Sequence, residues 1–258
     1  MRGWQGRIGI VSPDDAIIDD EYWAFVPDGV NLFVTRYTTA QRDDAISPDM
    51  VDSYADLAML RSAADTLRIT RPTAIGFACN SCSFVRGRGW DVEQGKAIGE
   101  AANCPGTTIS SAMIQALRLY DARTVSICAP YPAAVTERLR AYLASHEIAV
   151  AAMESSELDT EWKIGNTHPG YWYMQGRAVD RPESDLVLIA CSGSRTSAII
   201  ADLEADLGKP VITATQLLLW HCLQLSGVDS SGVERGSLFG RFGQAYRTHG
   251  IAALQQPL

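Results

Sequence analysis

Two short apolar stretches, each ending in a cysteine, constrain the fold of this chain more than any other feature. They are Ala74-Ile75-Gly76-Phe77-Ala78-Cys79 and Leu186-Val187-Leu188-Ile189-Ala190-Cys191. An apolar run of this length, followed by small polar residues, is typical of a buried parallel strand that turns directly into a helix. Both thiols are therefore predicted at the carboxyl end of a strand, beside a helix N-terminus, where open α/β sheets bind ligands and anions.

The two cysteine strands belong to a pattern that occurs twice along the chain. Three landmarks recur in the same order: Pro13 and Pro130, Cys79 and Cys191, and Pro105 and Pro210. A duplicated βα unit with small changes in loop length gives such a pattern. Strands that alternate with helices indicate parallel sheets covered on both faces. We predict an α/β fold of two similar α/β/α halves related by a pseudo-dyad, with the two cysteines facing each other across the cleft.

The predicted boundaries follow from this repeat. The first half covers residues 1–115, the second half covers 116–217, and the tail 218–258 packs back on the first half. Expected strands are 7–12, 31–37, 74–78, 105–110, 124–129, 148–153, 186–190 and 210–214. Expected helices are 48–67 with Ser47 as its cap, 92–102, 111–120, 133–145, 197–207 and 216–225. The aromatic-rich segment 158–185 lacks a clear period and is expected to be either a lid over the cleft or a packed loop.

Composition and charge limit the partners. The chain has 258 residues, of which 47% are hydrophobic and 20% are charged, as in an ordinary globular protein. Its net charge of -8, with scattered Lys and Arg, argues against nucleic acid or an anionic membrane as a partner. Neither a signal-peptide core nor a bilayer-spanning apolar run is found, so we expect a cytoplasmic protein. The expected ligand is a small carboxylate, and a homo-oligomer is left open.

The cysteines allow a second interpretation. The chain contains six of them: Cys79, Cys82, Cys104, Cys128, Cys191 and Cys222. Free thiols are expected rather than a disulfide framework in this compartment. Cys79 and Cys82 nevertheless form a CxxC at a strand-to-helix turn, the layout of a thioredoxin-like redox site. A redox or ligand-binding protein is therefore an alternative, although it leaves Cys191 and the duplication unexplained. No metal site is expected, because there is no second CxxC.

Two opposed thiols suit cofactor-free chemistry at a carbon next to a carboxylate. One thiolate removes a proton or adds to a polarised C=C bond, and the other thiol delivers a proton to the opposite side. A helix N-terminus lowers the pKa of a thiol from its reference value of about 8.5. Turn N–H groups hold the carboxylate and stabilise enediolate charge. Two inert buried cysteines are the structural alternative, but their matched positions favour Cys79 as nucleophile or base and Cys191 as general acid.

The order of these motifs resembles the aspartate/glutamate racemase superfamily and, within it, the branch of maleate cis-trans isomerase and arylmalonate decarboxylase. The resemblance covers nearly the whole chain and is carried by Ile8-Gly9-Ile10-Val11-Ser12-Pro13, Ser47-Pro48-Asp49, Cys79-Asn80-Ser81, Ser83-Phe84-Val85-Arg86-Gly87, Ala129-Pro130-Tyr131, Cys191-Ser192-Gly193 and Gly236-Ser237-Leu238-Phe239. It implies two flavodoxin-like halves, an active site in the cleft between them, and neither a metal nor an organic cofactor.

The resemblance also implies roles for individual residues. In the isomerases the position of Cys79 is a nucleophile that adds to the substrate double bond, and the position of Cys191 is the proton donor. In the decarboxylases the first position is glycine, so the presence of both thiols points to an isomerase or racemase. Decarboxylation of a substituted malonate with Cys191 as sole proton donor is the alternative. The carboxylate-binding positions implied by the resemblance are Pro13, Asn80, Ser81, Tyr131 and Ser192.

Overall fold

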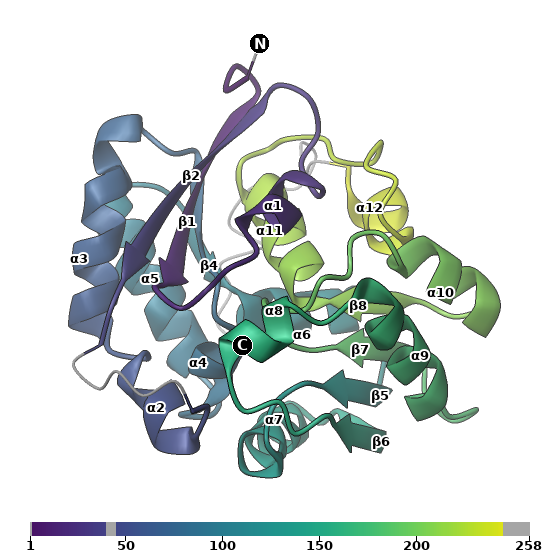
Figure 1. The fold of residues 1–258 in the computed structure, drawn as a ribbon. Helices are drawn as coiled ribbons and strands as arrows, with labels where there is room; N and C mark the ends of the chain where they lie inside the picture. Colours follow the sequence, from purple (N-terminus) through teal and green to yellow (C-terminus); the bar gives the residue numbers. More distant parts are fainter. Residues whose placement is uncertain (1, 40–44, 245–258) are drawn as a thin grey trace.

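Two parallel sheets form the framework of the computed structural model, which describes residues 2–39 and 45–244 (Figure 1). The first sheet has the order β2 (Val30–Tyr37), β1 (Gly6–Pro13), β3 (Ala74–Phe77) and β4 (Gly106–Thr108). The second has the order β6 (Ala149–Ser155), β5 (Thr124–Ala129), β7 (Leu186–Ile189) and β8 (Val211–Thr213). All neighbouring strands in the two sheets run parallel. The predicted α/β fold with two similar halves is confirmed.

Helices connect the strands in both halves. Those before β5 are α1 (Asp19–Trp23), α2 (Pro48–Ser53), α3 (Leu57–Leu67), the 3₁₀ turn η1 (Arg68–Thr70), α4 (Asn80–Phe84), α5 (Trp90–Ala102) and α6 (Ile109–Leu119). Those after β5 are α7 (Ala133–Ser145), α8 (Glu161–Gly165), α9 (Pro169–Val179), α10 (Ile200–Leu207), α11 (Ala214–Leu225) and α12 (Ser237–Phe242). Within the described part of the chain, no helix is both long and apolar enough to cross a bilayer.

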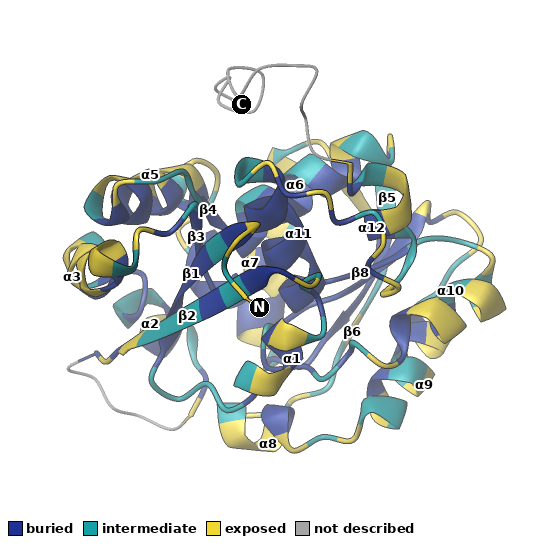
Figure 2. Ribbon diagram, turned by 90° about the horizontal axis from the view of Figure 1, so that it is seen from above, coloured by how far each residue is buried: buried dark blue, intermediate teal, exposed yellow. Residues whose placement is uncertain are grey.

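The core is continuous between the two halves. The residues of β3 and β7 are buried throughout, as expected for strands of a sheet that is covered on both faces. Figure 2 shows exposed residues on the outer faces of α3, α5, α9 and α10, whereas the central strands and α11 are buried. The positions where a strand ends and a helix begins are therefore held by a rigid, close-packed interior.

Helix α11 packs against the first sheet although it follows the last strand of the second. It contacts β1, β3, β4 and α6. Gly76 in β3 permits this approach, because an added Cβ would lie 2.7 Å from Leu218 and 2.8 Å from the Cys222 sulfur. The proposed division into 1–115 and 116–217 stays a prediction, as does packing of the 218–258 tail on the first half, and residues 245–258 lie outside the described residues.

Every predicted strand is present, although β4 covers only Gly106–Thr108 of the predicted 105–110. Several predicted helix bounds are wrong: α5, α10 and α11 begin at residues 90, 200 and 214 instead of 92, 197 and 216. The stretch 48–67 forms two helices, because the Asp56 carboxylate accepts hydrogen bonds from the N–H groups of Ala58 and Met59 and caps α3. Ser47 caps α2, as expected, by accepting the Met50 N–H at 3.1 Å. Helix α6 begins at Ile109 and is capped by Thr108, instead of beginning at residue 111.

The segment 158–185 contains two helices, so the packed-loop alternative is wrong, whereas the alternative of a lid over the cleft stays a prediction. Thr160 caps α8, and His168 caps α9 with Pro169 in its first turn. Helix α9 buries Trp172, Gly176 and Val179, which lie on one face of the helix. Helix α9 packs against β5, β6 and β7, and α8 brings an acidic side chain to the pocket described next.

Candidate active site

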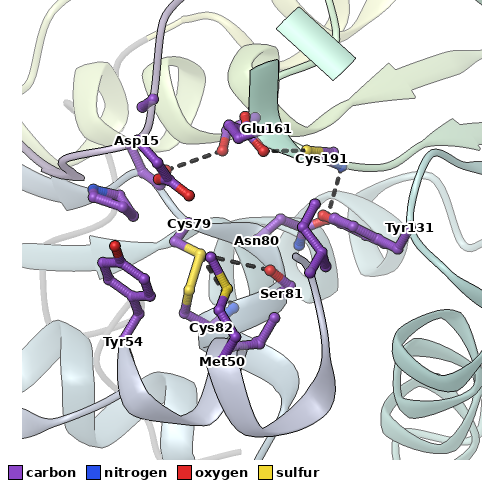
Figure 3. A pocket seen from close by; sticks show the side chains of 16 residues that line it. Asp15, Met50, Tyr54, Cys79, Asn80, Ser81, Cys82, Tyr131, Glu161 and Cys191 are labelled. Carbon is purple, nitrogen blue, oxygen red and sulfur yellow. Dashed lines mark hydrogen bonds between the residues drawn. A yellow bond between two sulfur atoms is a disulfide. The ribbon is translucent and has the colours of Figure 1, made fainter. Parts of the chain in front are cut away.

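A pocket lies where the carboxyl ends of β1, β3, β5 and β7 come together (Figure 3). The space between its walls, counted together with the solvent at its mouth, is about 440 Å³. Both halves contribute to its wall, which consists of Pro13, Asp15, Ala16, Ile46, Met50, Val51, Tyr54, Ala78, Cys79, Asn80, Ser81, Cys82, Tyr131, Glu161, Cys191 and Ser192. Every site residue predicted from the sequence lies in this wall, and both cysteine turns therefore meet at one cavity.

Cys79 stands at the start of α4 and is joined to Cys82 by a disulfide. The expectation of free thiols throughout the chain is therefore wrong at this pair, whereas Cys104, Cys128, Cys191 and Cys222 are free. The Cys79 sulfur accepts the Cys82 N–H at 3.3 Å and lies 3.6 Å from the Ser81 hydroxyl. Nucleophilic or basic chemistry at Cys79 thus requires prior reduction of the disulfide, because the thiolate is the reactive form.

Cys191 occupies the corresponding turn of the second half in an unusual backbone conformation, with φ of 75°. Left-handed backbone at a residue other than glycine is uncommon and often marks a functional turn. The Cys191 N–H donates to the Asn80 side-chain oxygen at 3.2 Å, and its sulfur accepts the Gly193 N–H at 3.2 Å. The Cys191 sulfur lies 3.8 Å from a carboxyl oxygen of Glu161.

The environment of Cys191 keeps it protonated. Burial, followed by the nearby Glu161, raises the pKa of this thiol well above its usual value, and the hydrogen bond from Gly193 opposes the shift. The expectation that the turn lowers the thiol pKa is therefore wrong for Cys191, because loss of solvation outweighs the N–H groups of the turn. A neutral thiol at pH 7 is suited to donating a proton.

The Asn80 amide nitrogen has no hydrogen-bond partner among residues 2–39 and 45–244, and this residue is 2% exposed. The Tyr131 hydroxyl is also buried in the wall, beside Cys191 and Ser81. Buried polar groups are normally paired, so an orphaned donor that faces a cavity points to a ligand. The Ser192 hydroxyl, in contrast, is already used, since it donates to the Ala78 carbonyl at 3.0 Å. Pro13 closes the end of β1 against the cavity.

Sequence reasoning missed two acidic residues of the wall. Asp15 lies in the loop after β1, and Glu161 opens α8. Figure 3 shows their carboxyl groups turned towards each other. Burial, followed by the charge of Asp15, raises the pKa of Glu161 to about 8. An acid at the start of an aromatic-rich segment carried no sequence signal of its own, because its approach to Cys191 depends on the fold.

The remaining wall is apolar and carries no cationic side chain. Ile46, Met50 and Val51 face the cavity from α2 and the residues before it. Among the described residues that line the pocket there is no Lys, Arg or His. The part of the chain that the structure describes also contains no group of three or more His, Cys, Asp or Glu residues arranged to hold a metal ion. Donors for a bound carboxylate are thus neutral side chains and backbone N–H groups.

Two duplicated α/β halves that each contribute a cysteine turn to one pocket define the class of this protein. The chain belongs to the arylmalonate decarboxylase family, because the sequence model of that family matches residues 27–239. Arylmalonate decarboxylase from Bordetella bronchiseptica is 27% identical over 229 residues, which is 85% of this chain and 86% of the relative. Maleate isomerase from Nocardia farcinica is 24% identical over 219 residues, which is 81% of this chain and 85% of the relative.

Comparison with solved structures shows that the fold is shared as well. The Nocardia farcinica maleate cis-trans isomerase was solved as a cysteine-to-serine mutant with a covalently bound succinylcysteine intermediate, and it aligns with a TM-score of 0.80 at 19% identity. The alignment covers 91% of this chain and 98% of that chain. The predicted branch of maleate isomerase and arylmalonate decarboxylase is confirmed.

Proposed function

We propose that this protein is an isomerase or racemase of a small carboxylic acid that uses two cysteines and no organic cofactor. The observation that carries the proposal is the convergence of Cys79 and Cys191, from matched strands β3 and β7, on one pocket. Protonated Cys191 supports a role as proton donor. Cys79, once reduced, supplies the nucleophile or base on the other side of the substrate.

For isomerisation, the reaction begins when the Cys79 thiolate forms a sulfur–carbon bond and the π electrons move towards the substrate carboxylate. Cys191 gives its proton to the resulting carbanion and later takes it back. Rotation about the former double bond and expulsion of the Cys79 thiolate then restore the C=C bond in the other geometry. The succinylcysteine seen in the Nocardia farcinica relative supports an intermediate of this type. For racemisation, Cys79 instead removes a proton from the carbon next to the carboxylate.

Two buried donors in the wall support carboxylate binding at the reacting end. The Asn80 amide nitrogen and the Tyr131 hydroxyl, both buried in the wall, supply hydrogen bonds to the carboxylate and to the enediolate that forms from it. Asn80 also receives the Cys191 N–H through its oxygen, which fixes the direction in which its nitrogen points. The turn of one half thereby orients the donor of the other.

Decarboxylation is the second candidate, and two observations favour it. The matching family model is that of arylmalonate decarboxylase, and the disulfide occupies Cys79 while leaving Cys191 free. In this reaction the carbon–carboxyl bond breaks, its electron pair stays on carbon, and Cys191 protonates that carbon. Cys79 has no role in such a mechanism.

Proton NMR of the reduced protein in deuterated water distinguishes these reactions. Maleate, arylmalonates, aspartate, glutamate and hydantoins are tested separately. We expect deuterium next to a carboxyl group without loss of carbon, or conversion of maleate to fumarate. Release of carbon dioxide would establish the decarboxylase instead. A reversible Cys79–Cys82 disulfide without turnover of any substrate would favour the redox alternative.

A further inference from the structure

Two acidic residues in the pocket wall indicate which polar group the substrate carries besides its carboxylate. Asp15 comes from the first half and Glu161 from the second, and both line the cavity. Figure 3 shows the two carboxyl groups together, on the same side of the disulfide. The buried donors of Asn80 and Tyr131 belong to the same wall, so one pocket offers both hydrogen-bond donors and acidic acceptors.

The position of Glu161 is built into the fold. An added Cβ at Gly193 would collide with the Glu161 carboxyl, so the turn after Cys191 leaves room for this acid by having glycine there. The Glu161 carboxyl also contacts the Cys191 sulfur at 3.8 Å. The acid is therefore held beside the reacting groups and does not extend into solvent.

We propose that the pocket selects a carboxylic acid whose second polar group is a nitrogen that donates hydrogen bonds, such as an ammonium group, and that Asp15 and Glu161 bind this nitrogen. A second carboxylate would meet two acids there without any lysine, arginine or histidine among the described lining residues to offset the repulsion. An ammonium group would instead be paired, with hydrogen bonds assisted by charge.

The protonation state of Glu161 agrees with this assignment. Burial, followed by the charge of Asp15, raises the pKa of Glu161 to about 8, so this carboxyl group is largely protonated at neutral pH. A bound cation favours the charged carboxylate, so Glu161 ionises and releases a proton when an ammonium compound binds. The apolar side chains of Ile46, Met50 and Val51 provide contact for the carbon chain between the two polar ends.

This inference rests on the proposed function, because it deepens the same site, but a binding experiment tests it without turnover. Succinate, β-alanine and butyrate share one carboxylate and a similar chain, and differ at the other end by carrying a carboxylate, an ammonium and a methyl group. Isothermal titration of the reduced protein measures the dissociation constant of each. We expect β-alanine to bind at least about tenfold more tightly than succinate or butyrate.

The Glu161→Gln variant identifies the group responsible. Its preference for β-alanine over succinate is expected to fall by about tenfold or more, since one acceptor charge is removed. Glu154→Gln is the matched control, because Glu154 is exposed on β6 and its substitution removes the same charge outside the pocket. Tighter binding of succinate, equal binding of the three compounds or binding of none contradicts the inference. The preference without any turnover in the NMR experiment would instead contradict the proposed function alone.

Discussion

The Cys191 sulfur lies 3.8 Å from the Glu161 carboxyl, although the two residues belong to different elements of the second half. The pKa of each group is raised. Burial and the nearby Glu161 keep the Cys191 thiol protonated, and burial and the charge of Asp15 keep Glu161 largely protonated at neutral pH. A proton donor is thus ready beside the cavity before substrate arrives.

Reduction is expected to control activity, because the structure joins Cys79 to Cys82. The oxidised protein should lose at least about 90% of its turnover and recover it with dithiothreitol, which reduces the disulfide to two thiols. Cys82→Ser should make turnover independent of reductant, since no partner remains for Cys79. Cys104→Ser is the control, because Cys104 lies outside the pocket and is free. Full turnover by the oxidised protein would show that Cys79 is not required and would favour the decarboxylase.

The Tyr131 hydroxyl is expected to bind substrate. Tyr131→Phe should lower kcat/KM by about ten- to hundredfold, through one lost hydrogen bond to the enediolate. Cooperative unfolding should be kept, because the aromatic ring that fills this buried position remains. Tyr142→Phe is the matched control, since its hydroxyl is also buried but lies outside the pocket. Equal loss of activity in both variants would contradict the assigned role.

The raised pKa of Glu161 predicts how the free energy of unfolding changes with pH. Its pKa rises from 4.5 to about 8 on folding, so the folded state holds this proton more tightly than the unfolded state, and its contribution to stability falls as the pH rises between these values. Asp15, Cys191, Tyr22 and Tyr131 face the group, and none of them supplies a cation.

Urea unfolding of the wild type and of Glu161→Gln tests this dependence. The variant should gain on the order of 1–3 kcal/mol of unfolding free energy relative to wild type between about pH 5 and about pH 8. Other titrating groups cancel in that difference, because both proteins contain them. A difference that stays constant with pH would show that Glu161 is ionised in the folded protein at pH 5.

The packing of α11 against β3 is expected to be disturbed if Gly76 gains a side chain. Gly76→Ala places a Cβ 2.7 Å from Leu218 and 2.8 Å from the Cys222 sulfur, and should lower the unfolding free energy by about 1–3 kcal/mol. Gly232→Ala is the control, because no atom lies within 4 Å of its added Cβ. Thermal unfolding measures both variants. Equal melting temperatures would mean that α11 shifts without cost.

The framework of the fold was predictable because apolar runs and their end signals are local. Cys79 and Cys191 were placed at matched strand ends from the runs before them, and the structure puts both in one pocket. The break between α2 and α3 had a signal in Asp56, but the apolar residues Tyr54 and Ala55 continued the helical period and hid it.

The rest of the site depends on contacts between distant parts of the chain. The Asn80 oxygen meets the Cys191 N–H across 111 residues, and no local pattern specifies that pairing. Glu161 approaches Cys191 because of how α8 packs, and this decides its protonation. The sequence showed the CxxC spacing of Cys79 and Cys82, but whether the thiols are paired depends on their geometry and on the redox conditions.

Turnover by Cys79→Ala, measured under reducing conditions by proton NMR in deuterated water beside Cys191→Ala, tests the two-cysteine mechanism most directly. The account predicts that each variant loses at least about a thousandfold in rate while keeping its circular dichroism spectrum and cooperative unfolding. Full activity of Cys79→Ala, with Cys191→Ala inactive, would contradict the mechanism and leave Cys191 as the sole proton donor of a decarboxylase.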